Sequence, residues 1–503
     1  MTTDYILYGM PASLYTAKVR SYLRKQRIPF EERSPGHPQF REQVVPTIGR
    51  WIIPVLQTPS GTLVQDGSMI IDYLESLRGP APPGTVDGLE TDRTGHPQTR
   101  LGEQGPSAVP PDPLMRVLAH LFELFGSEGL VRPAMHYRWN FDADNLEFLR
   151  RDFISALAPG VSANEQSDTF AFSSSRMRAA TKAFGVNAET IPLIEQSTRE
   201  LLARFDQHLA TTPYLLGTTP SHGDYGLLGP LHAHLGRDPH PSAMLKQIAP
   251  RVWRWIERMN APDDDAGEYL GQAPQWIEPE SLAPLLAVIA QDYLPEIRAY
   301  VAYANDWLAD RPDLPAGTSG VKKSSVRWIG VTSMRWRDVS VDVMVMPYRL
   351  LLLQRVQDAA SRLNSAQNAR LRALLQATGL EEVLDLRCRR RVLHQGYSEV
   401  WGPDSQSVSF VPPTIPEEIT MSDLDQHFQT AVANSKTLSS RPDNATMLKL
   451  YALFKQGSVG DAPEEGPDDM IGMFKHKAWA ENHGMSQDDA KKAYIALIES
   501  LQD

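Results

Sequence analysis

A stretch dense in proline and glycine and a shorter polar stretch that contains three prolines divide this chain into segments. The first runs from Gly79 to Pro113 and the second from Ser405 to Pro416. Neither can hold a packed element for long, so we interpret both as linkers. The 503 residues suggest roughly three units by length alone. The positions of these linkers and of the changes in residue pattern predict folded segments at 3–78, 114–308, 309–415 and 421–503, with a linker at 79–113.

The composition narrows the class of protein. Hydrophobic residues make up 42% and charged residues 22%, which is typical of a globular chain. The formal charge of −11 argues against a broad nucleic-acid interface, so no nucleic-acid partner is expected. Cys388 is the only cysteine, which excludes an internal disulfide and fits a reducing compartment. Because no long apolar run and no basic leader occur, we expect a cytoplasmic protein without a membrane span.

The first segment alternates short apolar runs with helical patterns. The patterns predict a compact α/β unit of order βαβ-ββα, with a turn at residues 58–61. The expected strands are 5–8, 30–32, 53–56 and 62–65, and the expected helices are 13–26 and 68–77.

The next two segments differ from the first. Residues 114–308 show mostly helical patterns, including 114–125, 191–209, 244–259 and 282–308. From residue 326 to 345 the pattern alternates, which predicts a β-hairpin turning near Arg337-Asp338. Helices at 348–363 and 366–378 and one strand near 392–401 complete a small α+β extension.

The stretch from Ala12 to Arg20 follows the first strand and opens the first helix. A hydroxyl at a helix N-terminus adds a donor where anions are already favoured, so Ser13 is suited to stabilise a thiolate. The alternative role for Ser13 is an ordinary N-cap. This segment resembles the thioredoxin-like half of the glutathione transferases. The resemblance implies that Ser13 bonds the glutathione sulfur, with Tyr8 as the alternative.

Two further motifs of this segment carry the same resemblance. It implies that the Ile53-Pro54 bond is cis and that Ile53 offers backbone groups to glutathione; an ordinary edge-strand proline is the alternative. Asp66-Gly67-Ser68 opens the last helix, whose free N–H groups and Ser68 hydroxyl would hold the γ-glutamyl carboxylate. The family usually has an acidic residue directly before this serine, whereas Gly67 stands there. Asp66 is therefore also interpreted as a helix cap.

The segment around Ser221 and Asp224 resembles the helical half of the same family. Asp224 is three residues beyond Ser221 and can reach back to its N–H as a capping box, which is folding chemistry. Nearby, His232, His234 and His240 do not share a ligand spacing, so we expect no metal site.

The last 83 residues predict a small helical module. Leu424, Phe428, Ala431 and Val432 give a first helix an apolar face, and Ala490, Tyr494 and Ile498 belong to the stripe of the last one. The stretch from Met447 to Asp461 carries a resemblance to the acyl-CoA-binding proteins over the whole module. The fold class is therefore multi-domain α/β plus all-α: a thioredoxin-like domain, a transferase-type helical domain with its extension, and a four-helix module.

This second resemblance implies a set of ligand contacts. Tyr451 and Lys455 are four residues apart, so they share a helix face. By resemblance Tyr451 contacts the nucleotide, Lys455 the ribose 3′-phosphate and Tyr494 the adenine, while Gln456 neighbours the site. Lys475 matches a second phosphate-binding lysine, with Lys477 as competitor. Tyr494 could equally be a core residue, and both lysines solvated surface.

Together these observations predict a two-function protein. The C-terminal module would bind long-chain acyl-CoA. The rest of the chain before the second linker, called the body below, would use glutathione as a cofactor. The glutathione thiolate would attack a hydrophobic electrophile. The alternative is a non-catalytic acyl-CoA carrier whose body serves as a docking platform or homodimer interface.

Overall fold

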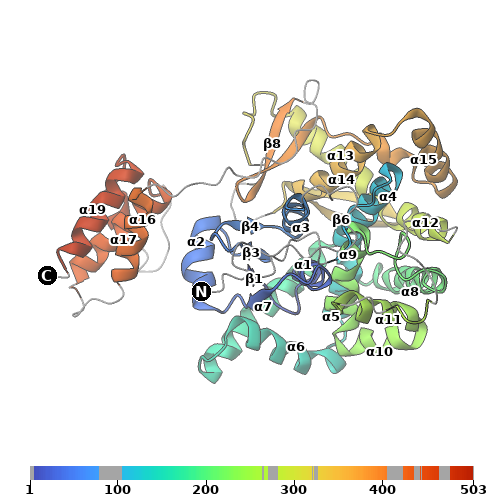
Figure 1. Ribbon diagram of the computed structural model, residues 1–503, viewed down its shortest axis with the longest axis horizontal. Coiled ribbons are helices and arrows are strands. Elements are labelled where there is room, and N and C mark those ends of the chain that lie inside the picture. Colours follow the sequence, from blue (N-terminus) through green and yellow to red (C-terminus); the bar gives the residue numbers. More distant parts are fainter. Residues whose placement is uncertain are drawn as a thin grey trace, which may run out of the picture. The chain divides into compact units, whose positions relative to one another are not determined.

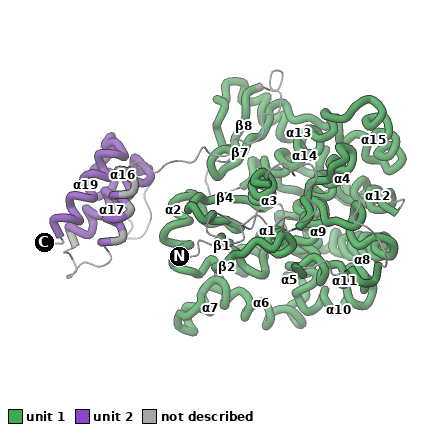
Figure 2. Tube along the Cα trace, in the orientation of Figure 1, with its two compact units in different colours: residues 1–415 green, residues 416–503 purple. Residues whose placement is uncertain are grey.

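The computed structural model describes residues 5–78, 105–262, 266–269, 281–319, 321, 327–404, 423–435, 442, 444–463 and 476–501. The chain forms two compact units, Met1–Ile415 and Pro416–Asp503, coloured separately in Figure 2. Each unit has a hydrophobic core of its own.

A four-stranded sheet of order β2-β1-β3-β4 begins the first unit. Strand β1 pairs in parallel with β2, and β3 runs antiparallel to both β1 and β4. The βαβ-ββα order predicted from the sequence is therefore confirmed. Strand β3 begins at Val55 rather than Ile53, because Pro54 has no N–H for the ladder. The elements are β1 (Tyr5–Tyr8), α1 (Leu14–Lys25), β2 (Phe30–Arg33), η1 (Phe40–Val44), α2 (Val45–Ile48), β3 (Val55–Gln57), β4 (Leu63–Gln65) and α3 (Gly67–Ser76).

A helical region follows. Two helices predicted as continuous, at 244–259 and 282–308, are each divided, at Ala249 and Tyr293. In both cases a proline enters the first turn of the next helix, where its missing N–H costs nothing. The elements are α4 (Pro113–Leu124), η3 (Phe125–Gly129), α5 (Val131–Trp139), α6 (Asp142–Leu157), α7 (Ala163–Ala183), α8 (Ile191–His208), α9 (His222–Pro230), η4 (Leu231–Gly236), α10 (Pro239–Ile248), α11 (Pro250–Asn260), α12 (Leu282–Asp292) and α13 (Leu294–Ala309).

The extension contains two β-hairpins around a pair of helices. The predicted first hairpin is confirmed, and it turns at Arg337 and Asp338, whose φ angles of 44° and 70° suit a two-residue turn. The single strand predicted near 392–401 is wrong. It is a second hairpin, which turns at Gly396 and Tyr397 because Gly396 adopts a φ of 59°. The elements are β5 (Gly330–Trp336), β6 (Val339–Val345), α14 (Pro347–Ser361), α15 (Ser365–Thr378), η5 (Glu381–Leu384), β7 (Arg390–Gln395) and β8 (Ser398–Asp404).

Helix α14 packs along α4, and Figure 1 shows the two helices side by side. Leu350, Leu353 and Val356 of α14 are buried in the same cluster as Leu118 and Leu121 of α4. The extension therefore shares the main hydrophobic core of the first unit.

The second unit is helical, as predicted. Ser486 caps its last helix by accepting the Asp489 N–H at 3.1 Å. The core joins three of the helices through Phe428, Leu453, Tyr494 and Ile498. The described elements are α16 (Asp423–Asn434), α17 (Asn444–Val459), a short helix at 476–480 and α19 (Gln487–Glu499).

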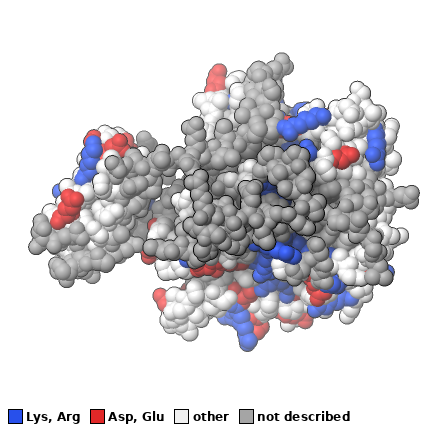
Figure 3. Space-filling model, viewed as in Figure 1, with Lys and Arg blue, Asp and Glu red and all other residues white. Residues whose placement is uncertain are grey.

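Two surface properties bear on partners. Within the described ranges, no helix is both long and apolar enough to cross a membrane. On the face shown in Figure 3, basic and acidic side chains of the described residues are interspersed rather than gathered into one large patch of a single sign.

Candidate functional site

Ser13 caps the N-terminus of α1. Its backbone is extended, with φ −85° and ψ 120°, and its Oγ accepts a hydrogen bond from the Thr16 N–H at 3.2 Å. The side chain is partly exposed. A serine hydroxyl that accepts one bond still carries a proton that it can donate. The cap and the thiolate-stabilising role are therefore compatible at this position.

Arg138 of α5 holds the loop that precedes Ser13. Its Nη1 donates to the carbonyl oxygen of Ala12 at 2.8 Å, and its Nε donates to Asp238 Oδ2 at 2.7 Å. Both Arg138 and Asp238 are buried. The ion pair with Asp238 holds the Arg138 side chain in place against the loop. No sequence pattern indicated this ion pair, because the two residues are 100 positions apart.

The histidines near Asp238 serve structural contacts. His234 lies 2.9 Å from the carbonyl of Ala134 and 3.0 Å from Arg138. His240 lies 2.7 Å from the Asp144 carboxylate. Among the residues that the structure describes, no three His, Cys, Asp or Glu side chains are grouped to hold a metal ion.

Tyr8, the alternative partner for a thiol, lies at the end of β1. Its ring is fully buried, and its hydroxyl donates to Gln57 Oε1 at 2.9 Å. Burial raises the pKa of the phenol, so the hydroxyl stays protonated. Tyr8 is bonded within the sheet, whereas Ser13 is partly open to solvent.

The Ile53-Pro54 bond is cis, as the sequence predicted. Ile53 itself is half-buried and packs at the edge of the core clusters that contain Ala12 and Val55. The Pro54 carbonyl accepts the Asp66 N–H at 3.4 Å, so this segment lies next to the start of α3.

Asp66 is the N-cap of α3. Its φ of 87° is left-handed, and its Oδ1 accepts the N–H groups of Ser68 at 2.9 Å and Met69 at 3.2 Å. The same oxygen accepts the Tyr348 hydroxyl at 3.1 Å. The capping role predicted for Asp66 is thus confirmed, and Gly67 occupies the first helical position without a side chain.

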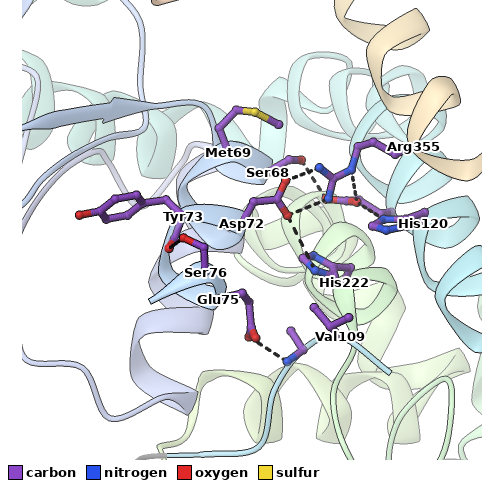
Figure 4. A network of polar contacts seen from close by, with 12 residues as sticks. Ser68, Met69, Asp72, Tyr73, Glu75, Ser76, Val109, His120, His222 and Arg355 are labelled. Carbon is purple, nitrogen blue, oxygen red and sulfur yellow. Dashed lines mark hydrogen bonds and ion pairs between the residues drawn. The ribbon is translucent and has the colours of Figure 1, made fainter. Parts of the chain in front are cut away.

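Ser68 belongs to a buried network of charges. Its hydroxyl accepts from Lys18 Nζ at 2.8 Å and donates to Glu123 Oε1 at 2.8 Å. Arg355 of α14 pairs with Asp72 (Figure 4). The same guanidinium lies 3.3 Å from Glu123 Oε2. Burial opposes the charge on Glu123, but Arg355 and Lys18 outweigh it and hold its pKa well below the usual range. The Ser68 hydroxyl is satisfied within the protein, so a ligand carboxylate would have to displace one of these partners.

His222 completes the network on the side of α9. Its ring is 5.3 Å from that of His120, and its Nε2 is 3.9 Å from Asp72 Oδ1 (Figure 4). Burial lowers the pKa of His222 to about 4, although Glu123 and Asp72 act in the opposite direction. His222 is therefore neutral near pH 7.

In the second unit, Tyr451 and Lys455 lie on one face of α17, and both are half-buried. The Lys455 ammonium is 5.3 Å from the centre of the Trp479 ring. Trp479 donates its Nε1 hydrogen to the Gly460 carbonyl at 2.8 Å, which fixes the ring. Trp479 was not predicted as a site residue from the sequence. The feature that could have indicated it is a tryptophan in a short helix just after the predicted Lys475.

Gln456 lies beneath this face. It is 1% exposed, and its Nε2 donates to Asp461 Oδ1 at 2.9 Å and to the Met485 carbonyl at 2.7 Å. Asp461 Oδ1 also accepts the Gly484 N–H at 2.8 Å. Gln456 therefore connects the end of α17 to the loop before α19.

Tyr494 and the second lysine differ from the other predicted contacts. Tyr494 is 4% exposed and packs edge-on against Phe428, with ring centres 5.2 Å apart. Lys475 lies outside the described residues, whereas its competitor Lys477 is described and exposed. The adenine contact of Tyr494 and the phosphate contact of Lys475 stay predictions.

Known proteins match the second unit closely. Residues 425–498 match the family Acyl CoA binding protein. Acyl-CoA-binding protein homolog 1 of Caenorhabditis elegans is 51% identical over 76 residues, which are 15% of this chain and 88% of that protein. The chain belongs to the acyl-CoA-binding protein family. An acyl-CoA-binding protein homolog of Manduca sexta is 47% identical over 81 residues, or 16% of this chain and 90% of that protein.

The first unit carries two glutathione transferase domains. Residues 7–82 match the glutathione S-transferase N-terminal domain, and residues 188–258 match the C-terminal domain. Among solved structures, the beta-etherase LigF of a Sphingobium strain is similar at 19% identity and a TM-score of 0.36, over 52% of this chain and 97% of that one. A glutathione S-transferase of Ceriporiopsis subvermispora in complex with glutathione is similar at 17% identity and a TM-score of 0.32, over 51% and 96%.

Proposed function

We propose that the second unit binds acyl-CoA through the face of α17 that carries Tyr451 and Lys455. The observation that carries the proposal is the Lys455 ammonium held 5.3 Å from the Trp479 ring, on a module half identical to a protein named for acyl-CoA binding. Coenzyme A presents an adenine ring beside a phosphorylated ribose. A cation next to aromatic rings matches that pairing of chemistries.

The residues around this face have separate roles in the proposal. Lys455 binds the ribose 3′-phosphate, and Tyr451 lies one turn away to contact the nucleotide. Gln456 keeps the loops at the end of α17 in place through its bonds to Asp461 and Met485. The acyl chain would occupy apolar surface of the same unit.

The test is a calorimetric titration of the full-length protein with palmitoyl-CoA, coenzyme A and palmitate. We expect saturable binding of palmitoyl-CoA, weaker binding of coenzyme A and none of palmitate alone, since the head group carries the polar contacts. An absence of binding to palmitoyl-CoA would refute the proposal.

For the first unit, we propose that the body binds glutathione and that the Ser13 hydroxyl donates a hydrogen bond to the thiolate sulfur, which keeps its negative charge. The partial positive charge of the α1 N-terminus supports an anion at this place. Ser13 adjoins a buried apolar cluster that includes Ala12, Trp139 and Phe153. In the reaction the sulfur forms a bond to an electrophilic carbon, and the leaving group departs with its electron pair.

Turnover of glutathione with chlorodinitrobenzene tests the enzyme proposal. Chloride leaves as the carbon–sulfur bond forms, and the thioether product is followed by its near-ultraviolet absorbance. We expect Ser13→Ala to reduce turnover by at least tenfold, while Ser175→Ala, on an exposed stretch of α7, leaves it unchanged. Equal turnover in Ser13→Ala and the wild type would remove Ser13 from the mechanism.

The second candidate is a non-catalytic acyl-CoA carrier whose body serves docking or homodimerisation. Two observations favour the carrier. The Ser68 hydroxyl is hydrogen-bonded to Lys18 and Glu123, and Gly67 has no side chain that could contact a ligand. Calorimetry with glutathione decides between the two, because a carrier would show no glutathione binding.

A further inference from the structure

The peptide unit that joins Ala12 to Ser13 is hydrogen-bonded on both of its sides. The Ser13 N–H donates to the Met10 carbonyl at 3.1 Å, and the Ala12 carbonyl accepts from Arg138 Nη1 at 2.8 Å. Ala12 is buried, so Arg138 takes the place of water at this carbonyl. Because a peptide unit is planar, holding both of its groups restrains the backbone on either side of it. The direction in which the Ser13 side chain leaves the backbone is therefore set in part by Arg138.

The five N–H groups of the Arg138 guanidinium are matched by five acceptor atoms. Nε and Nη2 donate to the two carboxylate oxygens of Asp238, at 2.7 and 3.1 Å. Nη2 also donates to the Ala233 carbonyl at 2.5 Å, and Nη1 lies 3.0 Å from His234 Nε2. Arg138 is 3% exposed, too little for a ligand to reach it. Because the donors of a guanidinium form a rigid fork, these bonds hold the group in one orientation.

Two neighbours are arranged to hold Arg138. His234 Nδ1 lies 2.9 Å from the Ala134 carbonyl, so Nδ1 carries the hydrogen and Nε2 accepts from Arg138. Burial and the Arg138 charge lower the pKa of His234 well below its usual range, which keeps this acceptor unprotonated. Asp238 stands at the N-cap of α10, where an aspartate usually bonds the first N–H groups of its own helix. Within the described part of the chain, its side chain makes no capping bond, and both oxygens bond Arg138 instead.

Arg138 also connects the two halves of the body. Ala12 lies in the N-terminal domain match and Asp238 in the C-terminal one, whereas Arg138, on α5, lies in neither. Asp238 pairs with the guanidinium at contact distance, so the charge of Arg138 is largely balanced where it stands. The contribution of Arg138 to the thiol site is therefore one of position.

We propose that Arg138 is a positioning residue for the thiol site: through the Ala12 carbonyl it holds the Ser13 hydroxyl in the orientation that donates to the glutathione sulfur. The inference rests on the glutathione-binding body proposed above. It adds to that body a residue that acts through Ser13 and touches no ligand itself. A hydrogen bond weakens steeply as the donor direction moves away from the acceptor, so a small rotation of the backbone at Ser13 reduces the stabilisation of the thiolate.

The experiment measures the pKa of the thiol of bound glutathione on the full-length protein, from thiolate absorbance against pH. Arg138→Lys keeps the positive charge but has too few donors for the five acceptors. The matched control is Arg132→Lys. Arg132 is also buried on α5, pairs with Glu296 at 2.5 Å and donates to a backbone carbonyl, that of Phe184. We expect Arg138→Lys to raise the thiol pKa by about one unit, in the same direction as Ser13→Ala, and Arg132→Lys to leave it unchanged.

A double variant tests whether Arg138 acts through Ser13. If it does, Ser13→Ala combined with Arg138→Lys has the same thiol pKa as Ser13→Ala alone, because the hydroxyl that Arg138 positions is already absent. Additive shifts would refute the positioning role, since they would show that the two residues act independently.

Asp238→Asn separates position from charge, and it preserves the shape of the side chain. We expect this variant to raise the thiol pKa, because the Arg138 fork loses its anchor. A lowered thiol pKa would mean that the unpaired guanidinium acts on the thiolate by its charge, which would also refute the proposal. If Arg138→Lys does not fold, Asp238→Asn carries the test.

The outcomes separate the two proposals. If Ser13→Ala shifts the thiol pKa while Arg138→Lys and Asp238→Asn leave it unchanged, the positioning role is refuted and the role of Ser13 stands. If the wild type binds no glutathione, or Ser13→Ala leaves the thiol pKa unchanged, the role of Ser13 is refuted and the positioning role with it. Thermal melting of each variant distinguishes position from stability: Arg138→Lys and Arg132→Lys should both melt at a lower temperature, but only Arg138→Lys should shift the thiol pKa.

Discussion

Replacing Glu123 by glutamine tests whether the buried charges beside α3 stabilise the first unit. Glu123 is 1% exposed, and its carboxylate lies 2.5 Å from Lys18 Nζ and 3.3 Å from Arg355 Nε. Glutamine keeps the volume but removes the charge, so Lys18, itself 2% exposed, loses this counter-ion. Breaking a buried ion pair costs about 3–5 kcal/mol. We expect the free energy of unfolding of the first unit to fall by about that amount.

The measurement is denaturant unfolding of the full-length protein followed by tryptophan fluorescence. Trp479 is the only one of the 10 tryptophans that lies beyond residue 415, so the signal reports mainly the first unit. The control is Glu147→Gln, because Glu147 is exposed and pairs with an exposed Arg151; its effect should stay below about 0.5 kcal/mol. A loss below about 1 kcal/mol for Glu123→Gln would refute the reasoning.

The same pair of proteins gives a pH test with a fixed sign. Arg355 and Lys18 hold the pKa of Glu123 well below its unfolded value of about 4.3. The contribution to stability is therefore fully present above that unfolded value and is lost as the pH falls through the lower folded pKa. The difference between the wild type and Glu123→Gln should narrow as the pH is lowered below about 4, and a constant difference would contradict the assignment.

Four further predictions follow from individual residues. Lys455→Met should weaken palmitoyl-CoA binding about tenfold or more in calorimetry, since a charge-assisted bond contributes about 1.5–3 kcal/mol; Lys492→Met, an exposed lysine of α19, should not. Ser13→Ala should raise the pKa of bound glutathione by about one unit, measured by thiolate absorbance, and an unchanged pKa would exclude the proposed hydrogen bond. Burial raises the pKa of Cys388 to about 11, so a thiol reagent at pH 8 should label it slowly until denaturant is added. Burial lowers the pKa of His222 to about 4, so stability should fall as the pH drops from about 6.5 toward 4, by up to about 1.4 kcal/mol per pH unit, and His222→Gln should lose less over that range.

Local signals predicted the local structure well. The capping pair Ser221 and Asp224 forms as expected, with the Ser221 N–H donating to Asp224 at 2.8 Å. Burial raises the pKa of Asp224 to about 6 even though this bond favours its charged form. The hairpin turn at Arg337 and Asp338 was also predicted, because alternation on both sides leaves only two residues for the turn. In each case the partners are close in sequence, so residue type and spacing carry the information.

Contacts between distant segments could not be predicted in this way. Tyr348 reaches Asp66 across 282 residues, and Arg355 reaches Asp72 across 283. In the sequence, Tyr348 and Arg355 are ordinary members of a predicted helix. The packing of α14 against α4 brings these two side chains to α3. A residue pattern within one segment does not predict which distant segment it will contact.

The packing of α14 against α4 limits where this polypeptide can be truncated. Truncation before residue 309 would uncover the apolar side of α4 and strip Asp72 and Glu123 of the guanidinium that neutralises them. The residues from Gly330 to Asp404 therefore cannot be removed without exposing the core of the first unit. A shortened protein that ends at α13 should be insoluble or only partly folded, although it would retain both transferase domain matches.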